Sequence, residues 1–136
     1  MANEAVKIEQ GIYNARRYAI NDTVTVTKGA LMMLEDPRTA SGSVVGTNGG
    51  AFAGIATMDK VANDGSSVIS CWTDGIFDLT CHAGAGINAG ALVSVSGVNF
   101  IKTASEAEVA AGGCVGKALE TATASEVIAV AVGRSI

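Results

Sequence analysis

The chain has 136 residues, of which 49% are hydrophobic, 16% are charged and 4% are aromatic, and its formal net charge is -4. A chain of this length fits one domain with its own core. The negative charge disfavours nucleic-acid binding, which needs a basic face, and no run approaches the roughly 20 apolar residues that span a bilayer. An apolar surplus with so little charge predicts protein partners, most simply further copies of the chain.

Residues 1–21 differ from the rest because they mix charged and large apolar side chains without a clear period. We interpret them as an N-terminal arm that becomes ordered on a partner surface. An extra edge strand that closes the chain's own barrel is the alternative. The start of the segment lacks the basic-then-apolar order of a secretory signal, so we expect synthesis in the cytoplasm. The candidate partner contacts in the arm are Ile8, Ile12, Tyr13, Arg16, Arg17 and Tyr18.

Residues 22–136 are predicted to form one β domain. Residues 23–27 alternate Thr with Val, which is typical of a half-buried strand. Further strands are expected over residues 30–34, 53–58, 67–73, 75–79, 91–95, 100–102, 114–119 and 126–132. Turns are expected at residues 36–39, 63–65 and 97–99, and a loop of small residues over 41–50.

One short helix and one unusual strand stand out in the second half. Ser105 and Glu108 form a capping box, which predicts a helix of one or two turns that Gly112 and Gly113 end. The last strand, residues 127–132, is apolar on both alternating faces. Such a strand is either central between layers or presses its second face on another subunit. The oligomer-interface candidates are therefore Ile128, Val130 and Val132.

The strongest signal is an internal repeat, over approximately residues 23–79 and 87–133. A Gly-Ala-Leu mark, a Gly-x-Ala mark and a Val-Ile run follow one another in the same order in both halves. The marks are Gly29-Ala30-Leu31, Gly54-Ile55-Ala56 and Val68-Ile69, and then Gly90-Ala91-Leu92, Gly116-Lys117-Ala118 and Val127-Ile128. The repeat predicts an all-β fold, a compact barrel or sandwich built from two pseudo-repeated meanders.

Residues able to carry chemistry are few and poorly spaced. Cys71, Cys81 and Cys114 lack the close pairing of zinc ligands, and His82 is the only histidine. Adjacent strand residues point to opposite faces, which separates Cys81 from His82. Lys117 is flanked by apolar residues, unlike an exposed attachment lysine. We therefore expect no catalytic, metal or cofactor site, and no enzyme.

The repeat marks, together with the run Val68-Ile69-Ser70-Cys71 to Gly75-Ile76-Phe77 and the terminal run Val127 to Val132, resemble the head-decoration (capsid cement) proteins of tailed bacteriophages. The resemblance covers roughly residues 23–133. It implies a small β-rich virion protein, typically a trimer, that binds the major capsid protein on the outer capsid surface after synthesis in the host cytoplasm. An N-terminal arm would contact the shell. The alternatives are another phage structural module, associated with a tail tube or fibre, and a small carrier or binding β domain.

Overall fold

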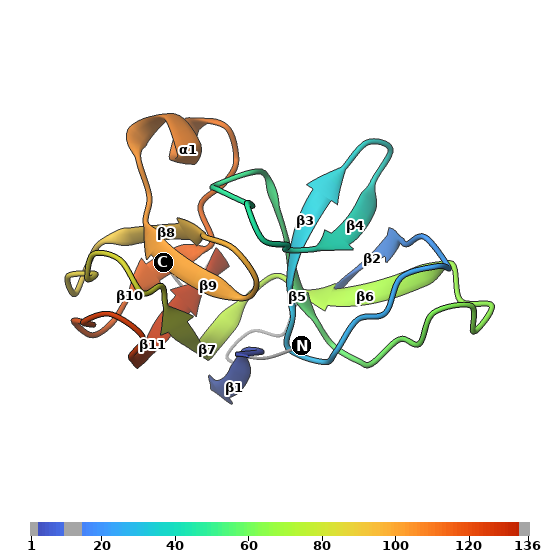
Figure 1. The fold of residues 1–136 in the computed structure, drawn as a ribbon, viewed down its shortest axis with the longest axis horizontal. Helices are drawn as coiled ribbons and strands as arrows, with labels where there is room; N and C mark the ends of the chain where they lie inside the picture. Colours follow the sequence, from blue (N-terminus) through green and yellow to red (C-terminus); the bar gives the residue numbers. More distant parts are fainter. Residues whose placement is uncertain (1–2, 10–14, 134–136) are drawn as a thin grey trace.

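The computed structural model describes residues 3–9 and 15–133, apart from the side chains of Lys7 and Glu9. Two β-barrel units lie side by side, each built from one half of the sequence (Figure 1). The elements are β1 (Val6–Glu9), β2 (Ala15–Ala19), β3 (Leu31–Glu35), β4 (Thr39–Gly42), β5 (Phe52–Ala56), β6 (Val68–Trp72), β7 (Gly75–Cys81), β8 (Leu92–Val95), β9 (Phe100–Thr103), α1 (Glu106–Ala110), β10 (Gly116–Ala118) and β11 (Val127–Val132).

The two barrels have the same topology. β2 to β6 close the first barrel, and β7 to β11 close the second. In each barrel the first strand pairs antiparallel with the fifth and parallel with the third, and every other pair is antiparallel. β1 adds a sixth strand to the second barrel by pairing with β7. The prediction of an all-β fold made of two repeated units is confirmed, as barrels and not as a sandwich.

The strand registers align the repeat marks residue by residue. Ala56 pairs with Cys71 in the first barrel, and Ala118 pairs with Val130 in the second. Each copy closes its own barrel instead of sharing one. The boundary falls between β6 and β7, so residues 75–79 belong to the second barrel and not to the first copy, where the sequence marks had placed them.

Glycine holds equivalent positions in β5 and β10 because another backbone approaches there. A Cβ atom on Gly54 would lie 2.6 Å from the carbonyl oxygen of Trp72, and one on Gly116 would collide with the carbonyl oxygen of Ala131. Trp72 and Ala131 are the equivalent residues of β6 and β11 in the two registers. The Gly-x-Ala mark therefore records a close strand approach that recurs in both barrels.

Two hydrophobic clusters fill the structure. One lies inside the first barrel and includes Met32, Ile69 and Cys71. The other fills the second barrel and extends across the junction to Leu31 and other outward-facing residues of the first barrel. Because successive strand residues point to opposite faces, β3 contributes to both clusters. This double burial explains its continuous apolar sequence.

The local predictions have mixed outcomes. Residues 23–27 form no strand and contribute only a bridge between Val26 and Lys60. The Asn21 side chain accepts a hydrogen bond from the Thr23 N–H, and the Thr25 hydroxyl accepts one from the distant Ala62 N–H. β4 lies partly in the segment expected to be a loop, where small residues gave no strand pattern. The helix is confirmed: Ser105 caps it and the reciprocal capping box is present.

The N-terminal segment contributes two strands, β1 and β2, to the chain's own barrels. β1 pairs with β7, and β2 pairs with β6 and β4. β2 is equivalent to β7, a counterpart that the sequence repeat did not reveal. Residues 15–19 are therefore not an arm in this structure; they form a strand of the chain's own barrel, which was the alternative interpretation of the segment.

The oligomer-interface prediction for β11 is wrong. Ile128, Val130 and Val132 are buried inside the second barrel, within the chain's own core. β11 is a central strand between β7 and β10, so its apolar inner face is covered by the same chain. On the opposite face Val127 is 59% exposed, whereas Ala131 is buried.

Candidate interaction surface

Tyr18 lies at the centre of a surface on the first barrel. Its hydroxyl donates a hydrogen bond to the carbonyl oxygen of Ala53 at 2.9 Å, which ties the side chain to β5. The guanidinium carbon of Arg38 lies 6.0 Å from the ring centroid, a cation–π geometry. Burial raises the pKa of Tyr18, and Arg16 and Arg38 oppose that rise. The phenol is therefore a neutral hydrogen-bond donor at physiological pH.

Three shallow hollows share Tyr18 as a lining residue. The first also contains Arg16 and Cys114, the second Leu34, Arg38 and the acidic residues Glu35 and Asp36, and the third Arg17, Arg38 and Val68. We call the residues Arg16, Arg17, Tyr18, Leu34, Arg38 and Val68 the Tyr18 surface.

The composition of the Tyr18 surface suits protein recognition. Leu34 and Val68 are large apolar residues that remain exposed. Tyrosine and arginine are enriched at the energetic centres of protein interfaces. Three of the chain's nine basic residues gather here, against two carboxylates, Glu35 and Asp36, that line the same hollow as Leu34 and Arg38. The Tyr18 surface can therefore contact an apolar and partly acidic partner.

The predicted contact residues are only partly brought together. Arg16, Arg17 and Tyr18 are consecutive residues of β2, on the Tyr18 surface. Ile8 is half exposed but lies on β1, which belongs to the second barrel. Ile12 and Tyr13 lie outside the described residues.

Sequence reasoning missed three members of the Tyr18 surface. Leu34, Arg38 and Val68 come from β3, the turn that follows it and β6, and the fold brings them next to β2. A lone arginine after a proline carries no signal of this kind.

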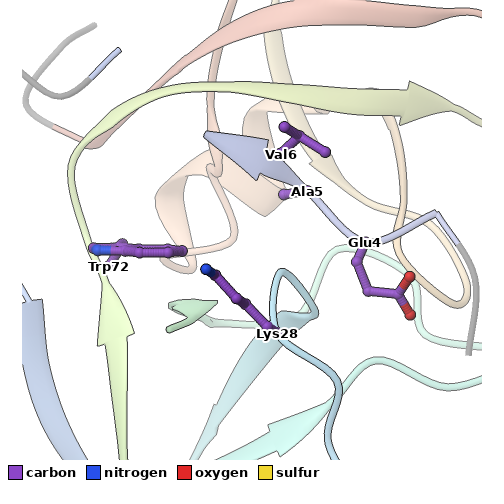
Figure 2. Close-up of a pocket in the computed structure, with 5 residues that line it drawn as sticks. All are labelled: Glu4, Ala5, Val6, Lys28 and Trp72. Atoms are coloured by element: carbon purple, nitrogen blue, oxygen red, sulfur yellow. The ribbon is translucent and has the colours of Figure 1, made fainter. Parts of the chain in front are cut away.

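A fourth hollow, of about 460 Å³, lies beside β1, between the two barrels. Figure 2 shows the Lys28 amine directed toward Trp72, with the carboxylate of Glu4 directed away from it. The amine lies 5.9 Å from the centroid of the Trp72 ring. Oε2 of Glu4 is buried and accepts no hydrogen bond from the described residues. Ala5 and Val6 complete the lining, so β1 forms one wall of the hollow.

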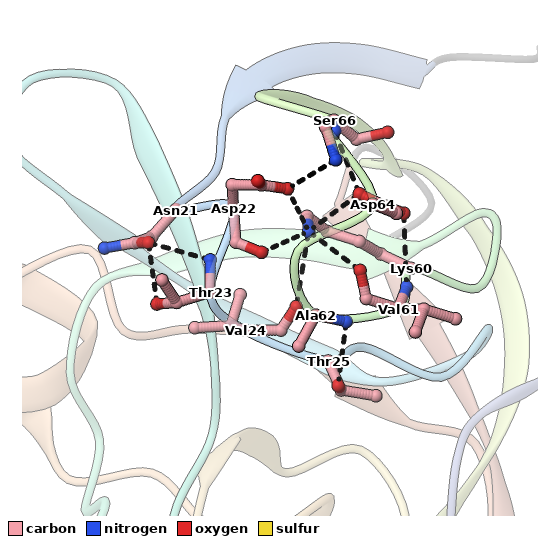
Figure 3. Close-up of polar contacts among 11 residues, drawn as sticks. Asn21, Asp22, Thr23, Val24, Thr25, Lys60, Val61, Ala62, Asp64 and Ser66 are labelled. Atoms are coloured by element: carbon pink, nitrogen blue, oxygen red, sulfur yellow. Dashed lines mark hydrogen bonds and ion pairs between the residues drawn. The ribbon is translucent and has the colours of Figure 1, made fainter.

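A buried lysine organises the loops at one end of the first barrel (Figure 3). Lys60 Nζ donates to Asp22 Oδ1 at 3.2 Å and to Asp64 Oδ1 at 3.1 Å, and also to the carbonyl oxygens of Asp22, Val24 and Val61. Burial acts to lower the pKa of Lys60, but the bonds to Asp64 and Asp22 outweigh it and leave the pKa raised. This cluster is a structural ion pair.

The residues that could have carried chemistry lie apart. In residues 3–9 and 15–133 no three His, Cys, Asp or Glu side chains gather into a metal-binding group. Burial raises the pKa of Cys71 to about 12 and raises the pKa of Cys81 and Cys114 as well, so these thiols are protonated at neutral pH. Lys117 lies within β10, in the strand position that its apolar neighbours predicted.

Comparisons with known proteins give no family. No family model matches the chain, and no curated protein matches it. Within its described residues, the structure contains no helix of the length and apolar character that a membrane crossing needs.

Proposed function

We propose that the chain is a structural protein that decorates the outer surface of a tailed-phage head and stabilises the shell by binding the major capsid protein. The observation that carries the proposal is the double barrel. The sequence marks that resemble head-decoration proteins are the equivalent, closely packed positions of two closed units. Rigid closed barrels suit a protein whose task is to hold neighbouring subunits in place.

The Tyr18 surface supports the same proposal. It presents an aromatic ring, exposed apolar residues and three arginines on the first barrel. Self-association into a small closed oligomer, a trimer by resemblance, would present several copies of this surface at once. Weak contacts then combine through effective concentration.

Co-sedimentation with mature, undecorated capsids of the phage that encodes the chain tests the proposal, with native mass measured in parallel. Saturable binding by a small closed oligomer is the expected result. Assembly into rings or tubes without capsid binding would overturn it in favour of a tail component. A folded protein that neither binds capsids nor assembles would equally reject the capsid function.

A further inference from the structure

β1 gives the second barrel a sixth strand that the first barrel lacks. It pairs antiparallel with β7 across Ile76–Asp78, next to the parallel contact that β9 makes with Thr80 and Cys81. β1 and β9 thus follow one another along the side of β7 that β11 leaves free. Strand addition at this edge is therefore a feature of the barrel that the chain already uses once.

β2 is the strand of the first barrel that corresponds to β7. Tyr18 pairs with Ile69 in β6, and Leu79 pairs with Ile128 in β11. Both strands also make a short parallel contact with the third strand of their barrel. β2 and β7 can therefore be superposed by register, with Tyr18 equivalent to Leu79.

The edge of β2 that corresponds to the β1-binding edge is Ala15–Arg17. Its parallel partner β4 reaches only Ala19, which pairs with Thr39. Among the residues that the structure describes, no strand pairs with Ala15–Arg17 on the side opposite β6. Unpaired strand edges are sites where a second chain can add a strand.

We infer that the edge Ala15–Arg17 binds an extended strand of a partner protein, antiparallel to β2, with carboxylate side chains beside the arginines. Arg16 and Arg17 are exposed on the edge itself, and Arg38 lies beside them on the Tyr18 surface. Two carboxylates of the chain itself, Glu35 and Asp36 at the end of the β3–β4 hairpin, line the same hollow as Arg38, and Glu35 already accepts a hydrogen bond from Ser41.

Charge also argues against the chain's own β1 as the occupant. In the register that β1 uses on β7, residue 7 pairs with residue 77. Transferred to β2, this register places a lysine opposite Arg16, and like charges directly opposite one another destabilise a strand pair. The occupant is therefore a different, acidic strand. Its identity as a capsid-protein segment rests on the proposed function.

The test is an NMR titration of the isotope-labelled full-length chain with two short synthetic peptides. One alternates valine with glutamate and the other alternates valine with lysine. We expect the acidic peptide to shift the amide signals of residues 15–19 and to slow their hydrogen exchange. The basic peptide should bind about tenfold more weakly, since each facing charge pair changes from attraction to repulsion.

Charge reversal identifies the edge. Arg17→Glu should reduce the preference for the acidic peptide, since one attractive pair becomes repulsive while Arg16 and Arg38 remain, and Arg16→Glu should act in the same direction. Lys28→Glu makes the same change of net charge elsewhere and should leave the preference unaltered. No shifts at residues 15–19, an equal effect of Lys28→Glu, or dimerisation of the free chain through β2 would overturn the inference. The titration needs no capsid, so its failure is distinct from a failure of co-sedimentation.

Discussion

The side-chain oxygen of Asn99 accepts a hydrogen bond at 2.9 Å from the backbone N–H of Leu31, and this bond joins the two barrels. Both residues are fully buried. Asn99 has a positive φ of 58°, which places it at the β8–β9 turn with its side chain toward the first barrel. Its own N–H donates to the hydroxyl of Ser43, also in the first barrel. The relative placement of the barrels is therefore fixed by a buried polar contact as well as by apolar packing.

Asn99→Gly should destabilise the chain by about 1–3 kcal/mol, because the buried N–H of Leu31 loses its acceptor. Glycine tolerates the positive φ, so the loss reports the side chain and not backbone strain. Asn63→Gly is the matched control, since Asn63 also has a positive φ but sits in a loop of one barrel. Urea denaturation measures both variants, and equal losses would contradict a role for the Asn99 side chain.

Gly54→Ala and Gly116→Ala should each cost about 3 kcal/mol, because a Cβ at either position overlaps a neighbouring carbonyl oxygen. Gly42→Ala is the control, since nothing lies within 4 Å of a Cβ there. Thermal denaturation compares the three variants. If either Gly54→Ala or Gly116→Ala were as stable as the parent chain, the two strands that meet at that glycine would be able to move apart without a loss of stability.

Ile128→Ala should destabilise the chain by about 2–5 kcal/mol through loss of core packing. Val127→Ala, one residue earlier on the exposed face of β11, should be close to neutral. Ile128→Asp should prevent folding altogether, because the carboxylate has no route to water inside the barrel. A soluble, folded Ile128→Asp monomer, seen by circular dichroism and sedimentation, would place Ile128 at a subunit interface after all.

Stability should fall in acid partly through Glu108. The hydrogen bond from Lys102, with that from the Ser105 N–H, lowers the pKa of Glu108 from 4.5 to about 2. Because the pKa of Glu108 is lower in the folded state than in the unfolded state, the ionised carboxylate stabilises the fold at pH values above the unfolded-state pKa. This stabilisation is lost as the pH falls from about 4.5 toward 2. Glu108→Gln should flatten that part of the curve, and Glu106→Gln, which leaves the ion pair between Lys102 and Glu108 in place, is the control. Parallel curves for the parent and Glu108→Gln would contradict this account.

Deletion of residues 1–9 should leave both barrels folded, because β1 is a sixth strand added to a closed unit. Deletion of residues 1–20 should abolish the fold of the first barrel, because it removes β2, which pairs with β6 along its whole length. Circular dichroism and proteolysis distinguish the two truncations. If the chain without residues 1–20 still folded, β2 would be an arm that the first barrel does not need.

Local sequence patterns were sufficient to predict an element where the interactions that form it lie within a short stretch of the chain. The capping box of Ser105 and Glu108 predicted α1, because the bonds that form it lie within four consecutive residues. The Gly-x-Ala marks predicted a repeated strand, because a close backbone approach excludes every side chain. The Tyr18 surface had no such signal, since its arginine and apolar members come from separate strands.

The sequence by itself determined that the chain is β-rich and built from two equivalent units, because the turn residues and the closely packed glycines are local features that occur in both halves. Tertiary structure alone decided that each unit closes its own barrel, that β11 is buried by its own chain and that β2 belongs to the first barrel. These outcomes depend on which strands pair across long separations. Leu31 and Asn99, 68 residues apart, meet only when both barrels have formed.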